Sequence, residues 1–371
     1  MAKGDPEAKC FDTVVLASPA QNLSLCRGYI FGLVRTHPQH ASKLNSFLDR
    51  LERSNPQLAF DYAATVPIET DAFGRWARLC DGGLIPAHQI LTLAYRLRTG
   101  GLDAAEVKVA LPRLLTSPEP QAAEAALDVV HTWIHSRKES GASLMTEDTQ
   151  LWSLIAAVLS RLMPSQVMGS FHWEEAMKSF CLVDPGAAAR IASGCLTNKE
   201  MSVEEAAERI LVGLAKQHPD LMMKELGRAL MEEKEAWRLQ IRGCRSLLTA
   251  VPPQSVMNWL NHTQFEGARK IAGSLPRPFL DENGNPLVPP LTEMVLTSFG
   301  SDEKVSRGFI CDTGIRSYSG DIVGQRLKEA AVASKFLQHA VPAIREWARR
   351  EKTGSEHEAE RWRQEDEEAF I

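Results

Sequence analysis

Two histidines four residues apart, preceded by a carboxylate, form the clearest group of potential metal ligands in the chain. His131 and His135 lie in a segment with helical apolar spacing, and Asp128 stands one turn before His131. In a helix these side chains would share one face, a spacing that zinc sites use. A metalloprotease helix would need Glu where Thr132 stands. We therefore expect interhelical hydrogen bonding or solvent exposure for the pair, and the sequence predicts no metal site.

A second group has the alternation that begins a calcium loop. Asp281, Asn283 and Asn285 occupy the first, third and fifth positions of such a loop. The sixth position is Pro286, where a calcium loop needs Gly, and the twelfth is Thr292, where it needs a bidentate Glu. These departures argue against calcium binding.

Motifs of covalent or cofactor chemistry are missing from the sequence. It contains no phosphate-binding glycine loop and no dinucleotide fingerprint, and the run 317–320 (SYSG) lacks the leading Gly and the strand of a nucleophile elbow. We therefore predict no catalytic residue and no cofactor, and we expect that the protein is not an enzyme. Catalysis by scattered residues would leave no such motif.

Charge is concentrated at the end of the chain. The 371 residues carry 42 basic and 47 acidic side chains, a formal net charge of −5. The segment from Thr353 has seven acidic side chains and two arginines, so the rest of the chain is formally neutral. A neutral body does not favour nucleic acid as the partner, although a local basic patch is compatible with it.

Composition and cysteine usage suggest a folded protein of a reducing compartment. Hydrophobic residues make up 44% of the chain and charged residues 24%, as in ordinary globular proteins. Seven cysteines are scattered without a C-x-x-C pair, and an odd number cannot all pair within one chain. Residues 1–10 lack a secretory signal, and the apolar stretch 151–163 is too short and too polar for a membrane span. We expect a cytoplasmic protein with no membrane contact.

Nearly every segment between residues 11 and 275 has helical apolar spacing, with Gly, Pro and Asn/Asp clusters as punctuation. Strand signals are almost absent, so the sequence predicts an all-α protein. Three helix starts have the pattern of a capping box, in which a short side chain caps the helix and a carboxylate three residues later reaches back. They are Asp103 with Glu106, Ser202 with Glu205, and Ser355 with Glu358.

The main internal repeat is a helix start with Arg among small and apolar residues. Stacked helix pairs produce such a repeat, because each pair buries its apolar face only against the next. The arginines return at intervals of 38, 41, 38 and 38 residues, at Arg190, Arg228, Arg269, Arg307 and Arg345.

This arrangement resembles HEAT-type repeats, in which the second helix of a pair often begins with an apolar residue followed by Arg. The resemblance is clearest over residues 180–350. It implies a superhelical solenoid of antiparallel helix pairs with about 38–41 residues per repeat, and bonds from the recurrent arginines between successive repeats. We expect the array over residues 1–352 and a charged helical tail or cap over 353–371. A compact, irregular helical domain is the alternative.

Two segments interrupt the helical pattern. Residues 275–290 are too rich in Pro for a helix and contain a turn at 282–285, which predicts a loop or small hairpin. Residues 312–324 form a second insertion, rich in Gly and Ser. Insertions at matching places in neighbouring repeats tend to emerge on one side of a solenoid. Phe279, Arg316 and Tyr318 are therefore candidate residues for binding a partner.

The charged tail supplies further candidates. Trp362 stands among charged residues, where it could pack on the last repeat as a cap or anchor a partner. Arg349 and Arg350 belong to the densest basic cluster, which Glu346 and Glu351 offset. A solvated helix face is the ordinary interpretation of such a cluster.

These features lead to three hypotheses for function. The first is a non-catalytic scaffold, adaptor or sensor that binds a protein partner through its concave face and projecting loops. The second is a nucleic-acid-binding protein resembling the bacterial alkylpurine DNA glycosylases, which are built from HEAT-like repeats. The third is the sensing array of a bacterial defence or signalling system, or a piece split from a larger protein, because the array begins almost at Met1 without an evident cap.

Overall fold

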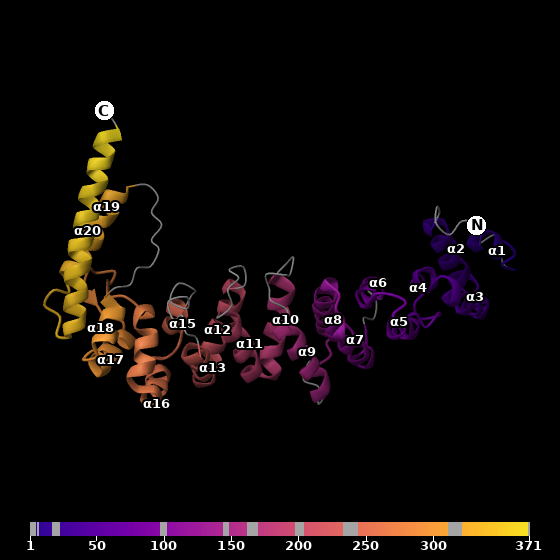
Figure 1. Cartoon of the computed structure of the whole chain (residues 1–371), viewed down its shortest axis with the longest axis horizontal. Coiled ribbons are helices and arrows are strands. Elements are labelled where there is room, and N and C mark those ends of the chain that lie inside the picture. Colours follow the sequence, from indigo (N-terminus) through magenta and orange to yellow (C-terminus); the bar gives the residue numbers. More distant parts are fainter. Residues whose placement is uncertain are drawn as a thin grey trace. The chain divides into compact units, whose positions relative to one another are not determined.

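The chain folds into helices joined by short connections, and the described residues contain one two-stranded hairpin besides. This computed structural model describes residues 5, 7–16, 23–96, 102–143, 148–161, 170–196, 204–232, 244–310 and 321–369. They form an N-terminal unit, Met1–Val183, and a C-terminal unit, Asp184–Ile371 (Figure 1). The predicted all-α class is confirmed. Within the described ranges, no helix combines the length and the apolar character needed to cross a membrane.

In the N-terminal unit each helix packs on its neighbours in the chain. α3 packs on α4, α7 on α8 and α9, and α8 on α9 and α10. The helices are α1 (Phe11–Leu16), α2 (Leu23–Thr36), η2 (Pro38–His40), α3 (Ala41–Ser54), α4 (Pro56–Ala63), α5 (Ala72–Asp81), η3 (Ala87–Gln89), α6 (Ile90–Arg96), α7 (Ala104–Thr116), α8 (Pro120–Glu139), α9 (Thr149–Arg161) and α10 (Ser170–Val183).

Aromatic side chains connect the helices in the core of this unit. Trp133 of α8 meets Trp152 of α9 edge to face with ring centroids 5.7 Å apart, and Trp152 meets Phe180 of α10 at 6.0 Å. Large rings fill the space between helix layers, and such pairs add stability beyond the area they bury. Nearer the N-terminus, Arg75 of α5 is 3% exposed and forms ion pairs with Asp49 and Glu52 of α3.

The C-terminal unit has the same local pattern of contacts. α11 packs on α12 and α13, α13 on α16, and α16 on α17 and α18. Its elements are α11 (Pro185–Leu196), α12 (Glu204–Gln217), α13 (Pro219–Glu232), α15 (Cys244–Ala250), α16 (Pro253–Ile271), η6 (Ala272–Ser274), β1 (Phe279–Leu280), β2 (Pro286–Leu287), α17 (Pro290–Phe299), α18 (Glu303–Ile310), α19 (Ile322–Ser334) and α20 (Pro342–Ala369).

Three helices of this unit share one sequence register. Pro185, Pro219 and Pro253 begin α11, α13 and α16 at intervals of 34 residues. Proline suits the first helical position because its fixed φ is helical and the missing N–H would have no partner there. The third, fourth and seventh residues after each proline are buried: Ala188, Ala189 and Ala192 in α11, Met222, Met223 and Leu226 in α13, and Val256, Met257 and Leu260 in α16.

Three of the five recurrent arginines lie at different distances from their helix starts. Arg190 is the sixth residue of α11, Arg228 the tenth of α13 and Arg269 the seventeenth of α16. In these three helices the residue with a constant position is the proline at the start.

Local helix signals have mixed outcomes. The capping box of Asp103 and Glu106 is confirmed at the start of α7, and Ser202 lies outside the described residues. The capping box predicted at Ser355 is wrong, because α20 begins at Pro342 and continues through this residue. Ser355 is 3% exposed, so packing prolongs the helix past a local signal for its start.

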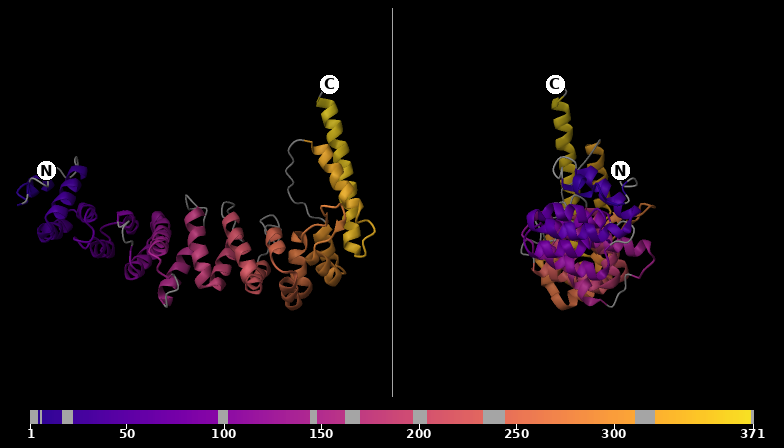
Figure 2. Two further views of the ribbon diagram at one scale, coloured as in Figure 1. Left: turned by 180° about the vertical axis from the view of Figure 1, so that it is seen from behind. Right: turned by 90° about the vertical axis from the view of Figure 1, so that its right-hand side faces the viewer.

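The predicted hairpin and tail take definite positions in the C-terminal unit. β1 and β2 pair antiparallel, with Phe279 opposite Leu287, so the hairpin predicted within 275–290 is confirmed. Of the insertion at 312–324, residues 312–320 lie outside the described residues, and Asp321 caps α19 through the N–H of Gly324. Figure 2 shows α20 in yellow lying along α19. The tail from residue 353 therefore continues α20.

Candidate functional site

A groove between α13 and α16 is a cavity whose lining is mostly apolar. It has a volume of about 570 Å³. One face of each helix lines it, because its lining residues recur every three or four positions. From α13 they are Asp220, Met223, Lys224, Gly227, Arg228 and Met231; from α16 they are Ser255, Asn258, Trp259, His262 and Thr263.

The groove depends on a glycine that makes room for a tryptophan. A Cβ atom added to Gly227 would lie 2.2 Å from Nε1 of Trp259 and 2.6 Å from its Cε2. A Cβ added to Gly267, further along α16, would lie 3.0 Å from Cη2 of the same indole. The indole therefore rests on two positions without side chains, and the backbone of α13 approaches α16 closely at Gly227.

Three of the polar side chains along the groove already have hydrogen-bond partners. Arg228 donates to the carboxylates of Glu225 and Glu232 at 3.2 and 2.9 Å, and these bonds raise the pKa of its guanidinium further. The Thr263 hydroxyl donates to the carbonyl of Trp259 at 3.1 Å, and Nδ1 of His262 lies 2.7 Å from the carbonyl of Asn258. This arrangement suits the binding of an apolar group better than a reaction.

α16 kinks at the end of the groove. Gln264 has φ 54° and ψ −139°, a conformation that is costly for a residue other than Gly. By the 34-residue register, Thr263 and Gln264 stand where α13 buries Ala229 and Leu230. The buried face of α16 is therefore interrupted at Thr263 and Gln264. After the kink, buried residues begin again at Gly267 and Ala268.

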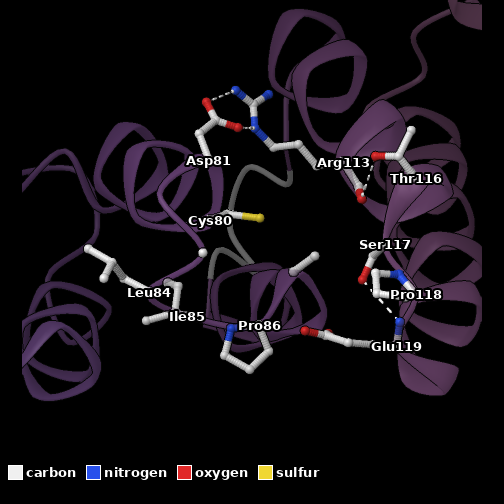
Figure 3. A pocket seen from close by; sticks show the side chains of 12 residues that line it. Cys80, Asp81, Leu84, Ile85, Pro86, Arg113, Thr116, Ser117, Pro118 and Glu119 are labelled. Atoms are coloured by element: carbon white, nitrogen blue, oxygen red, sulfur yellow. Dashed lines mark hydrogen bonds and ion pairs between the residues drawn. The ribbon is translucent and has the colours of Figure 1, made fainter.

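A second pocket, of about 380 Å³, lies in the N-terminal unit between the ends of α5 and α7. Figure 3 shows the paired side chains of Asp81 and Arg113 on one side of the pocket, and Glu119 on another side of it. Asp81 accepts two hydrogen bonds from Arg113, at 2.8 and 2.6 Å, and Glu119 lies 2.9 Å from Nδ1 of His88. Burial raises the pKa of the Cys80 thiol, and Asp81 raises it further. A nucleophilic thiol needs a lowered pKa, so this pocket holds no activated cysteine.

The three side chains considered for a metal site have other partners. Asp128 lies 2.8 Å from Nδ1 of His172 on α10, and His135 lies 3.2 Å from the carboxylate of Glu139. The interhelical bond is thus made by Asp128 and not by the histidine pair, of which His135 is 61% exposed. His131 stacks on His172. In the part of the chain that the structure describes, no group of three or more His, Cys, Asp or Glu side chains is arranged to hold a metal ion.

The candidate calcium ligands build the tip of the hairpin. Asp281 accepts hydrogen bonds from the backbone N–H of Asn283 and Asn285 at 2.9 and 2.8 Å. It also accepts one from the side-chain amide of Asn285 at 3.1 Å, and these bonds lower the pKa of its carboxyl. The alternation of Asp and Asn is thus explained by a turn, which Gly284 completes with φ 77°.

The structure describes four of the six predicted partner-binding residues. Phe279 is 45% exposed on the hairpin, and Arg316 and Tyr318 lie outside the described residues. Arg349 and Arg350 both pair with Glu346, at 2.5 and 3.3 Å. Trp362 is half-buried, with the guanidinium of Arg361 5.5 Å from its ring.

Two of the recurrent arginines connect helices that are not adjacent in the chain, with α12 lying between one pair and α17 between the other. Arg190 of α11 lies 3.4 Å from Glu225 of α13, whose side chain is 7% exposed. Arg269 of α16 donates to Asp302, just before α18, at 3.1 and 2.5 Å. Arg345 instead donates to the carbonyl groups of 339 and 340, beside its own helix start. These arginines serve the structure of the unit.

Comparison of the chain with protein-family models, with curated proteins and with solved structures finds no match. The site therefore has to be argued from its own geometry. Sequence reasoning missed the α13–α16 groove, whose two sides are far apart in the chain. The spacing of Pro219 and Pro253 is the signal that could have aligned them, because it places Met223 and Met257 in the same register.

Proposed function

We propose that the chain is a non-catalytic helical-repeat protein that binds a protein partner, and that the α13–α16 groove receives an apolar side chain of that partner. The observation that carries the proposal is the open apolar groove beside Trp259. Grooves between helices that are lined by aromatic and methionine side chains bind apolar faces of partner helices in many proteins. Aromatic residues in such places often dominate the binding energy.

The repeat part of the proposal rests on the local contacts and the proline register. Each helix of the C-terminal unit packs on helices near it in the chain, as stacked helix pairs do. The equal spacing of Pro185, Pro219 and Pro253, with the same buried positions after each, supports a repeating helix pair of about 34 residues. We infer a solenoid of such pairs, in which successive helices expose a continuous binding face.

The absence of an activated group in the described pockets supports a binding role. In the groove, Arg228, Thr263 and His262 already have hydrogen-bond partners. In the pocket of Figure 3, the charged side chains are paired and the pKa of the thiol is raised. Binding needs shape and apolar surface, and the groove offers both.

The proposal is tested by capturing the tagged full-length chain from its own host cells, with and without nuclease. Two variants are compared with the wild type after circular dichroism has shown equal helix content. Met231→Arg places a charge at the half-buried edge of the groove. Val212→Arg places the same charge at a half-buried position of α12 outside the groove.

We expect a stoichiometric protein partner that survives nuclease, at least tenfold weaker capture by Met231→Arg, and unchanged capture by Val212→Arg. Equal capture by both variants would refute the role of the groove. Capture of nucleic acid alone, lost after nuclease, would refute the protein-partner function and favour the glycosylase-like hypothesis. In that case Arg349→Glu with Arg350→Glu should abolish DNA binding at low salt. A partner that carries an effector domain would favour the sensing-array hypothesis.

A further inference from the structure

Three histidine rings form a column between α8 and α10 in the N-terminal unit. His131 of α8 lies between the other two, with its ring centroid 4.1 Å from that of His172 on α10 and 6.1 Å from that of His135. The planes are nearly parallel, at 16° and 5°. The short contact thus joins two helices, and the longer one lies within α8.

The three rings differ in their access to water. His131 is half-buried, whereas the side chains of His135 and His172 are 61% and 39% exposed. Each outer ring has a carboxylate, Glu139 at 3.2 Å for His135 and Asp128 at 2.8 Å for His172. His131 instead has rings around it, including Phe171 with its centroid at 6.2 Å. Of the three rings, His131 is therefore the one at which a positive charge is least favourable.

Burial and the two neighbouring rings together disfavour a charge on His131. Burial lowers the pKa of His131, and the neighbouring His172 and His135 lower it further, against a weaker opposing effect of Asp128 and Glu175. The charged groups with the largest effects on His131 belong to α8 and α10. Two imidazolium rings stacked at the His131–His172 distance would repel each other across the contact between the helices.

The same contact covers part of the aromatic core. Trp173, next to His172, is fully buried and donates its indole N–H to the carbonyl of Leu159 at 3.1 Å. Trp133, two residues after His131, is 1% exposed. Movement of α10 away from α8 would expose the buried side chains of Trp133 and Trp173 to water.

We propose that the column of His135, His131 and His172 is a proton-sensitive contact, which holds α10 against α8 while His131 is neutral and loosens α10 when His131 takes up a proton. The direction follows from linkage. A histidine that is harder to protonate in the packed state than in the open state stabilises packing above the ordinary histidine pKa, about 6.5. That stability is lost as the pH falls below this value, because the open state then binds more protons.

Hydrogen exchange of the full chain at pH 7.5 and pH 5.5, read by mass spectrometry, tests the proposal. Rates are corrected for the intrinsic effect of pH, and α12, which contains no histidine, serves as the internal reference. We expect protection of α10 to fall at pH 5.5 relative to α12, by up to about tenfold for each pH unit below 6.5.

Two variants locate the cause. His131→Phe keeps a stacking ring that cannot be protonated, so protection of α10 should become independent of pH. His135→Phe, at the exposed end of the column, should keep most of the dependence. Unchanged protection of α10 in the wild type at pH 5.5 would overturn the proposal even if a variant fails to fold. So would a full pH dependence in His131→Phe.

Discussion

Substitution of Gly227 by Ala tests the close packing of α13 on Trp259, and Gly213→Ala is its matched control. Both glycines lie well inside helices of the C-terminal unit, Gly227 in α13 and Gly213 in α12. A Cβ at Gly213 would meet nothing within 4 Å, whereas a Cβ at Gly227 would lie 2.2, 2.6 and 2.8 Å from three atoms of the indole. The same chemical change is thus made with and without a steric conflict.

Two effects of opposite sign decide the result. Replacing Gly by Ala inside a helix stabilises it by about 1 kcal/mol. At Gly227 the indole must shift by roughly 1 Å or more to restore an ordinary carbon contact, and such overpacking costs about 1–3 kcal/mol. Gly213→Ala should therefore stabilise the unit by up to about 1 kcal/mol. Gly227→Ala should change its stability by between about zero and a loss of 2 kcal/mol.

Urea denaturation of the full chain, followed by far-ultraviolet circular dichroism, measures both free energies of unfolding. Trp259→Ala supplies the third corner of a double-mutant cycle, since removing the indole should remove the conflict. In that background Gly227→Ala should stabilise as much as Gly213→Ala does. If Gly227→Ala already stabilises the protein with Trp259 present, the indole does not rest on α13, and the groove described here is wrong.

Three further predictions concern buried and charged groups. Arg75→Met should lower the free energy of unfolding by about 3 kcal/mol, because Glu52 loses a buried partner. Arg78→Met, at an exposed position, should lower it by less than about 1 kcal/mol. Urea denaturation of both variants measures these losses. Arg269 lowers the pKa of Asp302 to about 2. The wild type should therefore be more stable than Asp302→Asn above pH 4 and should lose this advantage between pH 4 and pH 2. The midpoint of unfolding, measured for both proteins across this pH range, checks the prediction. Burial raises the pKa of Cys181 and Cys195 to about 11; peptide mapping after iodoacetamide treatment at pH 8 should find exposed Cys10 alkylated before either.

The features that the sequence predicts correctly depend on neighbours within a few residues. The capping box of Asp103 and Glu106 and the turn that follows Asp281 are formed by side chains bonding to nearby backbone groups. Apolar spacing predicts the helices for a similar reason, because one turn decides which face is buried. Ser355 shows the limit of such signals. It has the pattern of a helix start, yet α19 covers this part of α20 and the helix continues.

The candidate site could not be predicted in this way, because each of its contacts joins residues of different helices. Asp128 shares a face of its own helix with His131 and His135, but its carboxylate meets His172, 44 residues later. From the sequence alone, Gly227 is a residue that destabilises the interior of α13. Its role in making room for Trp259 becomes apparent only in the structure. Composition and periodicity describe what a helix buries, and they leave open which helix covers it.

The arginines and the prolines of the C-terminal unit have regular spacings with different physical origins. Arg190 connects α11 to α13, and Arg269 connects α16 to the residue that precedes α18. Their depth within the helices differs because the bond depends on where the acidic partner lies, and a long side chain reaches over a full helical turn. A proline at the first helical position has no such freedom, since its ring fixes one φ angle and the missing N–H is tolerated only there. The proline therefore has the same position in α11, α13 and α16, whereas the arginine does not. The two helices that line the groove, α13 and α16, both begin in this way, and α16 differs by the kink at Gln264.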